Sequence, residues 1–237
     1  MAFSAKTLDF LFENRLQDSR DWFLDHKDTY QAVLLEPMKD LVRSLTPVML
    51  EIDAKVTTEP RVDKTICRLR RDLRDTRYSH DKSLYRDTMW LIFKRGKMHG
   101  TEVPGIYFEI TCDGFNYGCG FYHASAAYMN TMRRLILQGD PAFEKAKKAF
   151  LSQKLFHMEG ERYKRPHYPQ RPEEERQWLE QRGISFVAES SDFNLLFSDR
   201  LSQKLEKDFR VLAPIYHFLL HTSQAEQQYG LDRPELF

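Results

Sequence analysis

The sequence predicts an α+β fold in a single domain that covers residues 1–237. Three observations predict it: helical apolar spacing over the first sixty residues, strand-like patterns from about Thr65 to Tyr122, and amphipathic segments after Ala124. With 41% hydrophobic and 13% aromatic residues, the chain can fill a sizeable core. The sequence contains no internal repeat or flexible linker, which favours one domain.

The amino-terminal part reads as packed helices. Ser4 is expected to cap a first helix, and Asp18 or Ser19 to begin a second one that runs through Tyr30. Glu36-Pro37 is expected to break that helix and to open a third. The apolar stripe predicted for the first helix consists of Leu8, Leu11, Phe12 and Leu16.

The middle of the chain reads as a mainly antiparallel sheet. Asp113-Gly114 favours a two-residue hairpin turn, and the apolar run over residues 88–93 predicts a further strand. If Asp113 and Gly114 form the turn, alternating side chains from both strands share one buried face. These residues are Ile106, Phe108, Ile110, Cys112, Phe115, Tyr117, Cys119 and Phe121. Gly118 and Gly120 are interpreted as points of close backbone packing.

Packed helices return towards the carboxyl end. Ala124–Leu137 is amphipathic, and Asp140-Pro141 is a helix start signal. After a proline-rich loop, a short helix over residues 173–182, a strand over 184–188 and a long helix over 198–221 are expected.

Several classes of protein are disfavoured. No apolar run approaches the roughly 20 residues of a membrane span, and the amino terminus lacks a signal peptide pattern, so the cytoplasm is the expected compartment. Cys67, Cys112 and Cys119 are odd in number and form no CxxC pair, which argues against a disulfide framework and a zinc site. No nucleotide-binding glycine loop or Ser-His-Asp motif occurs, and the scattered histidines have no metal-ligand spacing. We therefore expect no metal site, and the sequence specifies no cofactor, catalytic residue or oligomeric state.

Charge is concentrated in one segment. Residues 61–97 carry a net charge of +7, whereas the whole chain carries only +1. Two interpretations stay open for this segment. Its arginines could converge on an anion, because guanidinium groups bind phosphate and carboxylate through paired donors. Alternatively, they could form a solvated surface paired with the neighbouring aspartates.

The basic segment resembles the family known as domain of unknown function 2461, whose members carry a stretch close to R-x-x-R-D-x-R-F-S-x-D-K-x-P-Y-K. Arg68, Arg71 and Asp72 match its start, whereas Arg77-Tyr78-Ser79 comes three residues late and Leu84 replaces the proline. Asp81-Lys82 and Tyr85-Arg86 resume the pattern. Residues 20–23, His26-Lys27 and Tyr30 are similar to the family's R-E-W-F-x-x-x-K-x-x-Y opening, and the Gly118/Gly120 hairpin and the Pro166/Tyr168 loop also look similar. The resemblance implies a fold and candidate positions but no activity.

The leading hypothesis is a protein that binds a small phosphorylated or carboxylated ligand through an arginine-rich pocket, with or without turning it over. The anion-binding residues expected are Arg68, Arg71, Asp72, Arg77, Ser79, Lys82 and Tyr85. Surrounding arginines should keep Asp72 ionised, so it is expected to hold an arginine in place and to be a poor general base. The alternative is a non-catalytic module for nucleic acid or a protein partner, because Tyr78, Tyr85, Trp90 and Phe93 interleave with the basic residues. The near-neutral chain disfavours nucleic acid.

Overall fold

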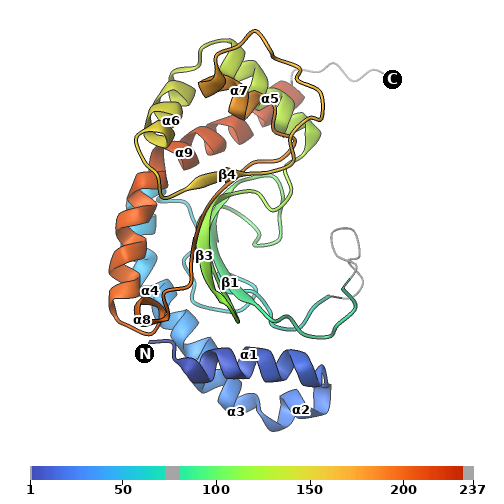
Figure 1. The fold of residues 1–237 in the computed structure, drawn as a ribbon, viewed down its shortest axis with the longest axis vertical. Helices are drawn as coiled ribbons and strands as arrows, with labels where there is room; N and C mark the ends of the chain where they lie inside the picture. Colours follow the sequence, from blue (N-terminus) through green and yellow to red (C-terminus); the bar gives the residue numbers. More distant parts are fainter. Residues whose placement is uncertain (1, 73–80, 232–237) are drawn as a thin grey trace. The chain divides into compact units, whose positions relative to one another are not determined.

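A computed structural model describes residues 2–72 and 81–231 and confirms the α+β fold (Figure 1). Helices form the amino-terminal part, an antiparallel sheet lies in the middle of the chain, and helices return after it. The elements before the sheet are α1 (Ala5–Gln17), α2 (Arg20–Asp25), α3 (Lys27–Tyr30), the π-helix η1 (Gln31–Leu35) and α4 (Glu36–Ile52). Those after its first hairpin are α5 (Ala126–Leu137), α6 (Pro141–Leu151), α7 (Glu173–Leu179), α8 (Phe193–Leu196) and α9 (Arg200–Leu231).

The sheet has the strand order β1-β2-β3-β5-β4. Its strands are β1 (Met89–Lys94), β2 (Gly105–Thr111), β3 (Gly114–Gly120), β4 (His157–Glu159) and β5 (Ser185–Ser190). All of these were predicted from the sequence except β4, a three-residue edge strand that pairs antiparallel with β5 and places Met158 opposite Phe186. The strand-like pattern that begins at Thr65 forms only isolated bridges, through Ile66 and Arg70. Most residues of β4 are polar or exposed, so it lacks the apolar alternation that identifies a strand.

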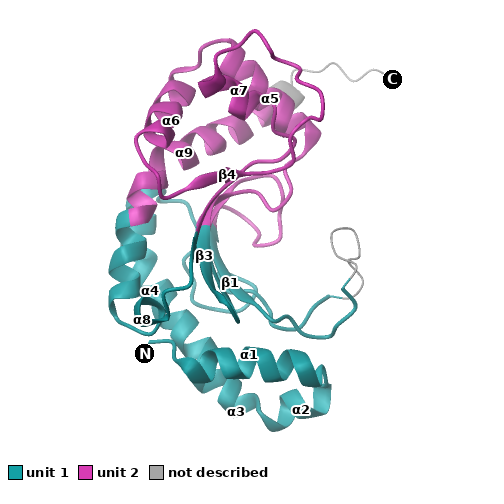
Figure 2. Ribbon diagram, viewed as in Figure 1, with its two compact units in different colours: residues 1–93, 107–117, 189–207 teal, residues 94–106, 118–188, 208–237 magenta. Residues whose placement is uncertain are grey.

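The described chain forms two compact units (Figure 2). Unit 1 comprises residues 1–93, 107–117 and 189–207, and unit 2 comprises residues 94–106, 118–188 and 208–237. The division passes through β2, β3 and α9, so no linker separates the two units along the chain. That residues 1–237 behave as one domain in solution stays a prediction. Among the described residues, no helix has both the length and the hydropathy to span a bilayer.

Helix α1 starts after Ser4 as predicted, but it buries a different face. Phe12 and Leu16 are 59% and 69% exposed, so the predicted stripe is wrong. The buried face consists of Thr7, Phe10, Leu11 and Asn14. Two of these residues are polar, and the Thr7 hydroxyl donates to the Val33 carbonyl at 2.7 Å. The Thr7 hydroxyl therefore has a partner on η1, whereas the buried side-chain amide of Asn14 has none among the described residues.

The helices after α1 differ from the prediction at two points. The single helix predicted through Tyr30 is divided at His26 into α2 and α3. Ser19 caps α2 as expected, and its hydroxyl accepts the Trp22 N–H. Glu36-Pro37 was expected to break the chain's helical course, but η1 leads directly into α4 and Leu35 keeps helical dihedral angles. Pro37 lies in the first turn of α4 and has no N–H to donate back into η1, where the Val33 carbonyl instead accepts the Thr7 hydroxyl.

The predicted hairpin is present, with its turn displaced by one residue. Strand β2 ends at Thr111 and β3 begins at Gly114, so Cys112 and Asp113 form the turn. Gly114 has φ +152°, a conformation that favours glycine. Displacing both strand ends by one residue preserves the alternation, so the predicted face survives. Its buried members are Ile106, Phe108, Ile110, Phe115, Tyr117, Cys119 and Phe121, whereas Cys112 is only half-buried.

Unit 2 has an aromatic core built around Trp178 of α7, which is fully buried. Its ring lies 5.0 Å from that of Phe186 and 5.4 Å from that of Phe143. Gly118 allows β3 to approach β5 closely, because a Cβ at this position would clash with the Phe186 carbonyl. The interpretation of Gly118 as a packing position is confirmed.

Helix α6 begins as the sequence predicts. The Asp140 carboxylate accepts the N–H groups of Ala142 and Phe143, and Pro141 occupies the first turn. The cap fixes the first residue of α6, which forms one wall of a groove in unit 2.

Candidate anion-binding site

The two ends of the basic segment lie side by side in unit 1. Arg70 and Tyr85 form an antiparallel bridge. The Arg71 N–H donates to the Leu84 carbonyl at 2.8 Å, and the Arg86 N–H donates to the Leu69 carbonyl at 3.0 Å. We call residues 68–72 and 81–86 the arginine hairpin. Because the intervening residues lie outside the described chain, only these two arms define its geometry.

Asp81 joins two arginines from different parts of the chain. Its carboxylate lies 2.8 Å from Arg71 Nη2 and 3.3 Å from Arg15 Nη2 of α1. The Ser83 N–H donates to the same carboxylate at 3.0 Å. Hydrogen bonding from Ser83 and the charges of Arg71 and Arg15 lower the pKa of Asp81. Asp81 therefore stays ionised at neutral pH and orients both arginines.

Arg71 is the arginine of the hairpin best suited to hold a ligand. Its side chain is only 19% exposed, and its Nη2 already binds Asp81. Its Nε is buried without a hydrogen-bond partner among the described residues. A buried donor without a partner costs free energy, which an added acceptor recovers.

Tyr85 anchors the hairpin to the helices. It is 2% exposed, and its ring stacks on Phe23 of α2 with centroids 5.0 Å apart. Its N–H donates at 3.0 Å to the carboxylate of Asp18, which follows α1 in a left-handed conformation. Burial raises the pKa of Tyr85, while the nearby charges of Arg70 and Arg20 act in the opposite direction. The phenol therefore keeps its proton at neutral pH.

The predicted site residues fall into three groups: within the cluster, exposed, or outside the described residues. Arg71 and Tyr85 lie in the cluster just described. Arg68 binds Asp63 through Nε at 2.7 Å, and its side chain is 65% exposed. Asp72 and Lys82 are exposed, on the two arms of the hairpin. Arg77 and Ser79 lie outside the described residues. The predicted convergence on one cavity thus stays a prediction.

Sequence reasoning missed the contribution of the amino-terminal helices. Arg15 and Asp18 come from the end of α1, and Arg20 begins α2. They lie some fifty residues from the arginine hairpin in sequence, so no local pattern connects them. One signal was available: Arg20 begins the family-like opening, which was interpreted only as support for the fold.

Other site chemistry has little support in the described chain. Over residues 2–72 and 81–231, no group of three or more His, Cys, Asp or Glu side chains is arranged to hold a metal ion. Burial raises the pKa of Cys67, to about 12, and of Cys119, so neither thiol supplies a nucleophilic thiolate at neutral pH.

Fold and site together define an α+β protein with a cluster of arginines on its amino-terminal unit. The chain belongs to the family described as conserved hypothetical protein (DUF2461), whose model matches residues 6–218. The resemblance inferred from the sequence is therefore confirmed. No curated protein matches the chain. The match includes α1, α2 and the described arms of the arginine hairpin, so the cluster lies entirely within the family region.

One departure from the family pattern has a simple structural reading. Leu84 stands where the family stretch has proline, and the contact it makes with Arg71 uses its carbonyl oxygen. Proline also carries that carbonyl, so this backbone contact is compatible with either residue.

Proposed function

We propose that the protein binds a small phosphorylated or carboxylated ligand at the arginine cluster of unit 1. Arg71 carries the proposal, because its mostly buried guanidinium is held by Asp81 and retains a buried Nε–H without a partner among the described residues. A guanidinium fixed in this way can donate to a planar or tetrahedral anion without first losing its conformational freedom.

The charge of the cluster supports an anion as the ligand. Arg15 and Arg71 share the Asp81 carboxylate, and Arg20 and Arg70 lie close enough to Tyr85 to affect its ionisation. Residues 68–72 and 81–86, together with Arg15, Asp18 and Arg20, hold seven basic and three acidic side chains, a net charge of +4. Such an excess favours an anionic ligand.

The same groups favour binding over general acid–base catalysis. Asp81 is held in its ionised form and Tyr85 in its protonated form, so neither has a pKa near neutrality. In an enzymatic reaction at this cluster, the ligand itself or residues other than Asp81 and Tyr85 would have to donate or accept the proton.

The experiment is a titration of phosphorylated and carboxylated metabolites, selected by thermal shift, into the wild type and Arg71→Ala. We expect the variant to bind about 10–150-fold more weakly, the equivalent of about 1.5–3 kcal/mol for a charge-assisted hydrogen bond. Arg43→Ala is the matched control, since Arg43 lies in the same unit, 54% exposed, and pairs with Asp40 one turn away. Equal affinities for wild type and Arg71→Ala would reject the proposal.

A protein-interaction module is the second candidate, favoured by the apolar surface of α1 and α2. Phe12, Leu16 and Leu24 are all more than half exposed, although single exposed apolar residues are common. Sedimentation of the wild type and of Phe12→Ser/Leu16→Ser tests it. A change in assembly state with unchanged metabolite binding would favour this candidate over the first. The nucleic-acid alternative needs exposed rings on which bases can stack. Two of the rings proposed for this role from the sequence, those of Tyr85 and Phe93, are buried, which disfavours this alternative.

A further inference from the structure

Unit 2 has a groove of its own. It has a volume of about 920 Å³ and is lined by one face of α6 and one face of α9. Its basic side chains are Lys145 and Lys148 from α6 and Arg210, His217 and His221 from α9. The acidic side chain in its lining is Asp140, which lies 3.1 Å from His221 Nε2 and caps α6.

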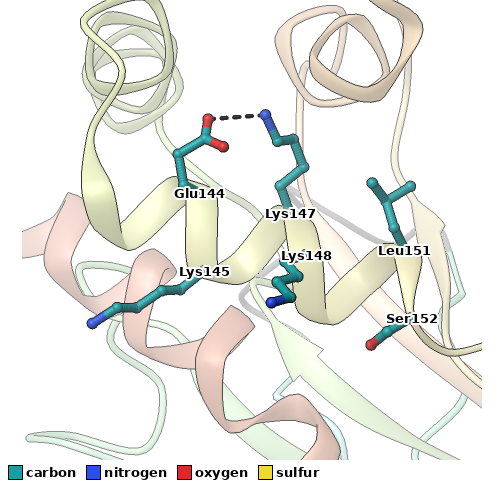
Figure 3. Close-up of a pocket in the computed structure, with 6 residues that line it drawn as sticks. All are labelled: Glu144, Lys145, Lys147, Lys148, Leu151 and Ser152. Carbon is teal, nitrogen blue, oxygen red and sulfur yellow. Dashed lines mark hydrogen bonds and ion pairs between the residues drawn. The ribbon is translucent and has the colours of Figure 1, made fainter.

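The lysines of α6 divide between its two sides. In Figure 3, Lys147 points to the same side as Glu144, whereas Lys145 and Lys148 point to the opposite side. Lys147 lies 2.9 Å from Glu144 and 3.9 Å from Glu175 of α7. Lys145 and Lys148 line the groove and make no ion pair within the described part of the chain.

We infer that this groove binds an organic polyphosphate, a small molecule with two or more linked phosphates on a body of nucleoside size. Cationic side chains line both walls of the groove, Lys145 and Lys148 on α6 and Arg210 on α9. A ligand with two or more linked phosphates can contact cations on both walls at once, whereas a single phosphate group offers fewer such contacts.

The remaining walls suit the organic part of such a ligand. They consist of small or apolar groups, including Ala142, Ala149, Ala213 and Pro214. A volume of this size lies within the range typical of small-molecule sites. The lining contains no Phe, Tyr or Trp side chain, and the smaller imidazole rings of His217 and His221 offer less area for stacking, so a single-stranded nucleic acid is disfavoured. The first-turn amides of α6 already bind Asp140, so the side chains, not the helix terminus, would hold the phosphates.

The test measures ATP binding, in the absence of magnesium, to the wild type and to Lys145→Ala/Lys148→Ala. We expect the double variant to bind at least about tenfold more weakly, because two charge-assisted contacts are lost. Lys147→Ala is the matched control: it removes one lysine from the same helix but from the opposite side, and we expect its affinity for ATP to stay within about twofold of wild type. Arg71→Ala should also bind ATP at this groove as the wild type does, which separates this inference from the proposed function.

Three further probes define the ligand class. Tripolyphosphate should compete with ATP, and inorganic phosphate should compete only weakly. No ATP binding, or equal loss in Lys147→Ala and the double variant, would overturn the inference. A short single-stranded DNA oligomer that binds the groove more tightly than ATP would also overturn it, in favour of nucleic acid.

Discussion

The two units place their basic side chains in contrasting settings. In unit 1, Arg71 and Arg15 are fixed by a carboxylate and partly withdrawn from solvent. In unit 2, Lys145 and Lys148 extend from the surface of α6 and line a groove between α6 and α9. Net charge differs as well, being −3 over the residues of unit 1 and +4 over those of unit 2. Long-range attraction of anions should therefore be stronger at unit 2, whereas unit 1 has the better pre-formed contacts.

A cluster of like charges can therefore either hold elements of the fold together or project from the surface without a structural role. Asp81 and Asp18 connect the arginine hairpin to the helices, so charges in unit 1 also support the local structure. Lys145 and Lys148 make no comparable contact that joins one element of unit 2 to another within the described residues. Substitutions in unit 1 should consequently affect stability and binding together, and substitutions in the groove should affect binding alone.

The largest effect expected is on the free energy of unfolding, and it tests whether the two units unfold together or separately. Gly118→Ala should destabilise the protein by about 3–5 kcal/mol, because the new Cβ would clash with the Phe186 backbone. Since β2, β3 and α9 each contribute to both units, we expect one cooperative denaturant transition, shifted as a whole.

Gly183→Ala is the control for this experiment, since a Cβ there meets no atom within 4 Å. Two separate transitions, with only one displaced by Gly118→Ala, would show that the units unfold independently. The prediction of a single domain would then be wrong.

The second effect is the pH dependence of unit 1. Asp81→Asn should lower the melting temperature at pH 7, because Arg71 and Arg15 lose their shared carboxylate. Since the folded-state pKa of Asp81 is lowered, its stabilisation is present above its unfolded pKa of about 4 and is lost as pH falls through the folded value.

Melting curves from pH 7 down to pH 2 would check this dependence. The difference between wild type and Asp81→Asn should shrink below about pH 4. A difference that stays constant across this range would indicate that the charge of Asp81 contributes nothing.

The smallest effect expected is in the groove. Lys145→Ala/Lys148→Ala should change the free energy of unfolding by no more than about 0.5 kcal/mol, since alanine is a good helix former and no ion pair is lost. Chemical denaturation measures this difference. A loss of more than about 1 kcal/mol would mean that these lysines contribute to packing, and the contrast between the units would fail.

Sequence reasoning succeeded where the determinants are local. The Asp140-Pro141 signal located the start of α6 because cap and proline act within one turn. The hairpin face was correct because strand alternation tolerates a displacement of both strand ends by one residue. The prediction of the buried face of α1 was wrong because that face includes the polar residues Thr7 and Asn14. The partner of Thr7, Val33, lies 26 residues away in sequence.

Only the part of the candidate site that lies in the basic segment was predicted from the sequence. Arg71 and Tyr85 were identified from the basic stretch and its family pattern. Arg15, Asp18 and Arg20 belong to helices whose charges look ordinary in sequence. Their role depends on how α1 and α2 pack beside the arginine hairpin, which is a tertiary property that no local spacing encodes.

Asp18 also bears on how this region can vary among relatives. Its left-handed backbone, with φ 42°, suits Asn, Asp and Gly, whereas its bond to the Tyr85 N–H needs a short side chain with an acceptor oxygen. Only Asp and Asn meet both conditions. Substitution at this corner should therefore be confined to that pair during divergence, even where neighbouring surface positions of α1 and α2 drift freely.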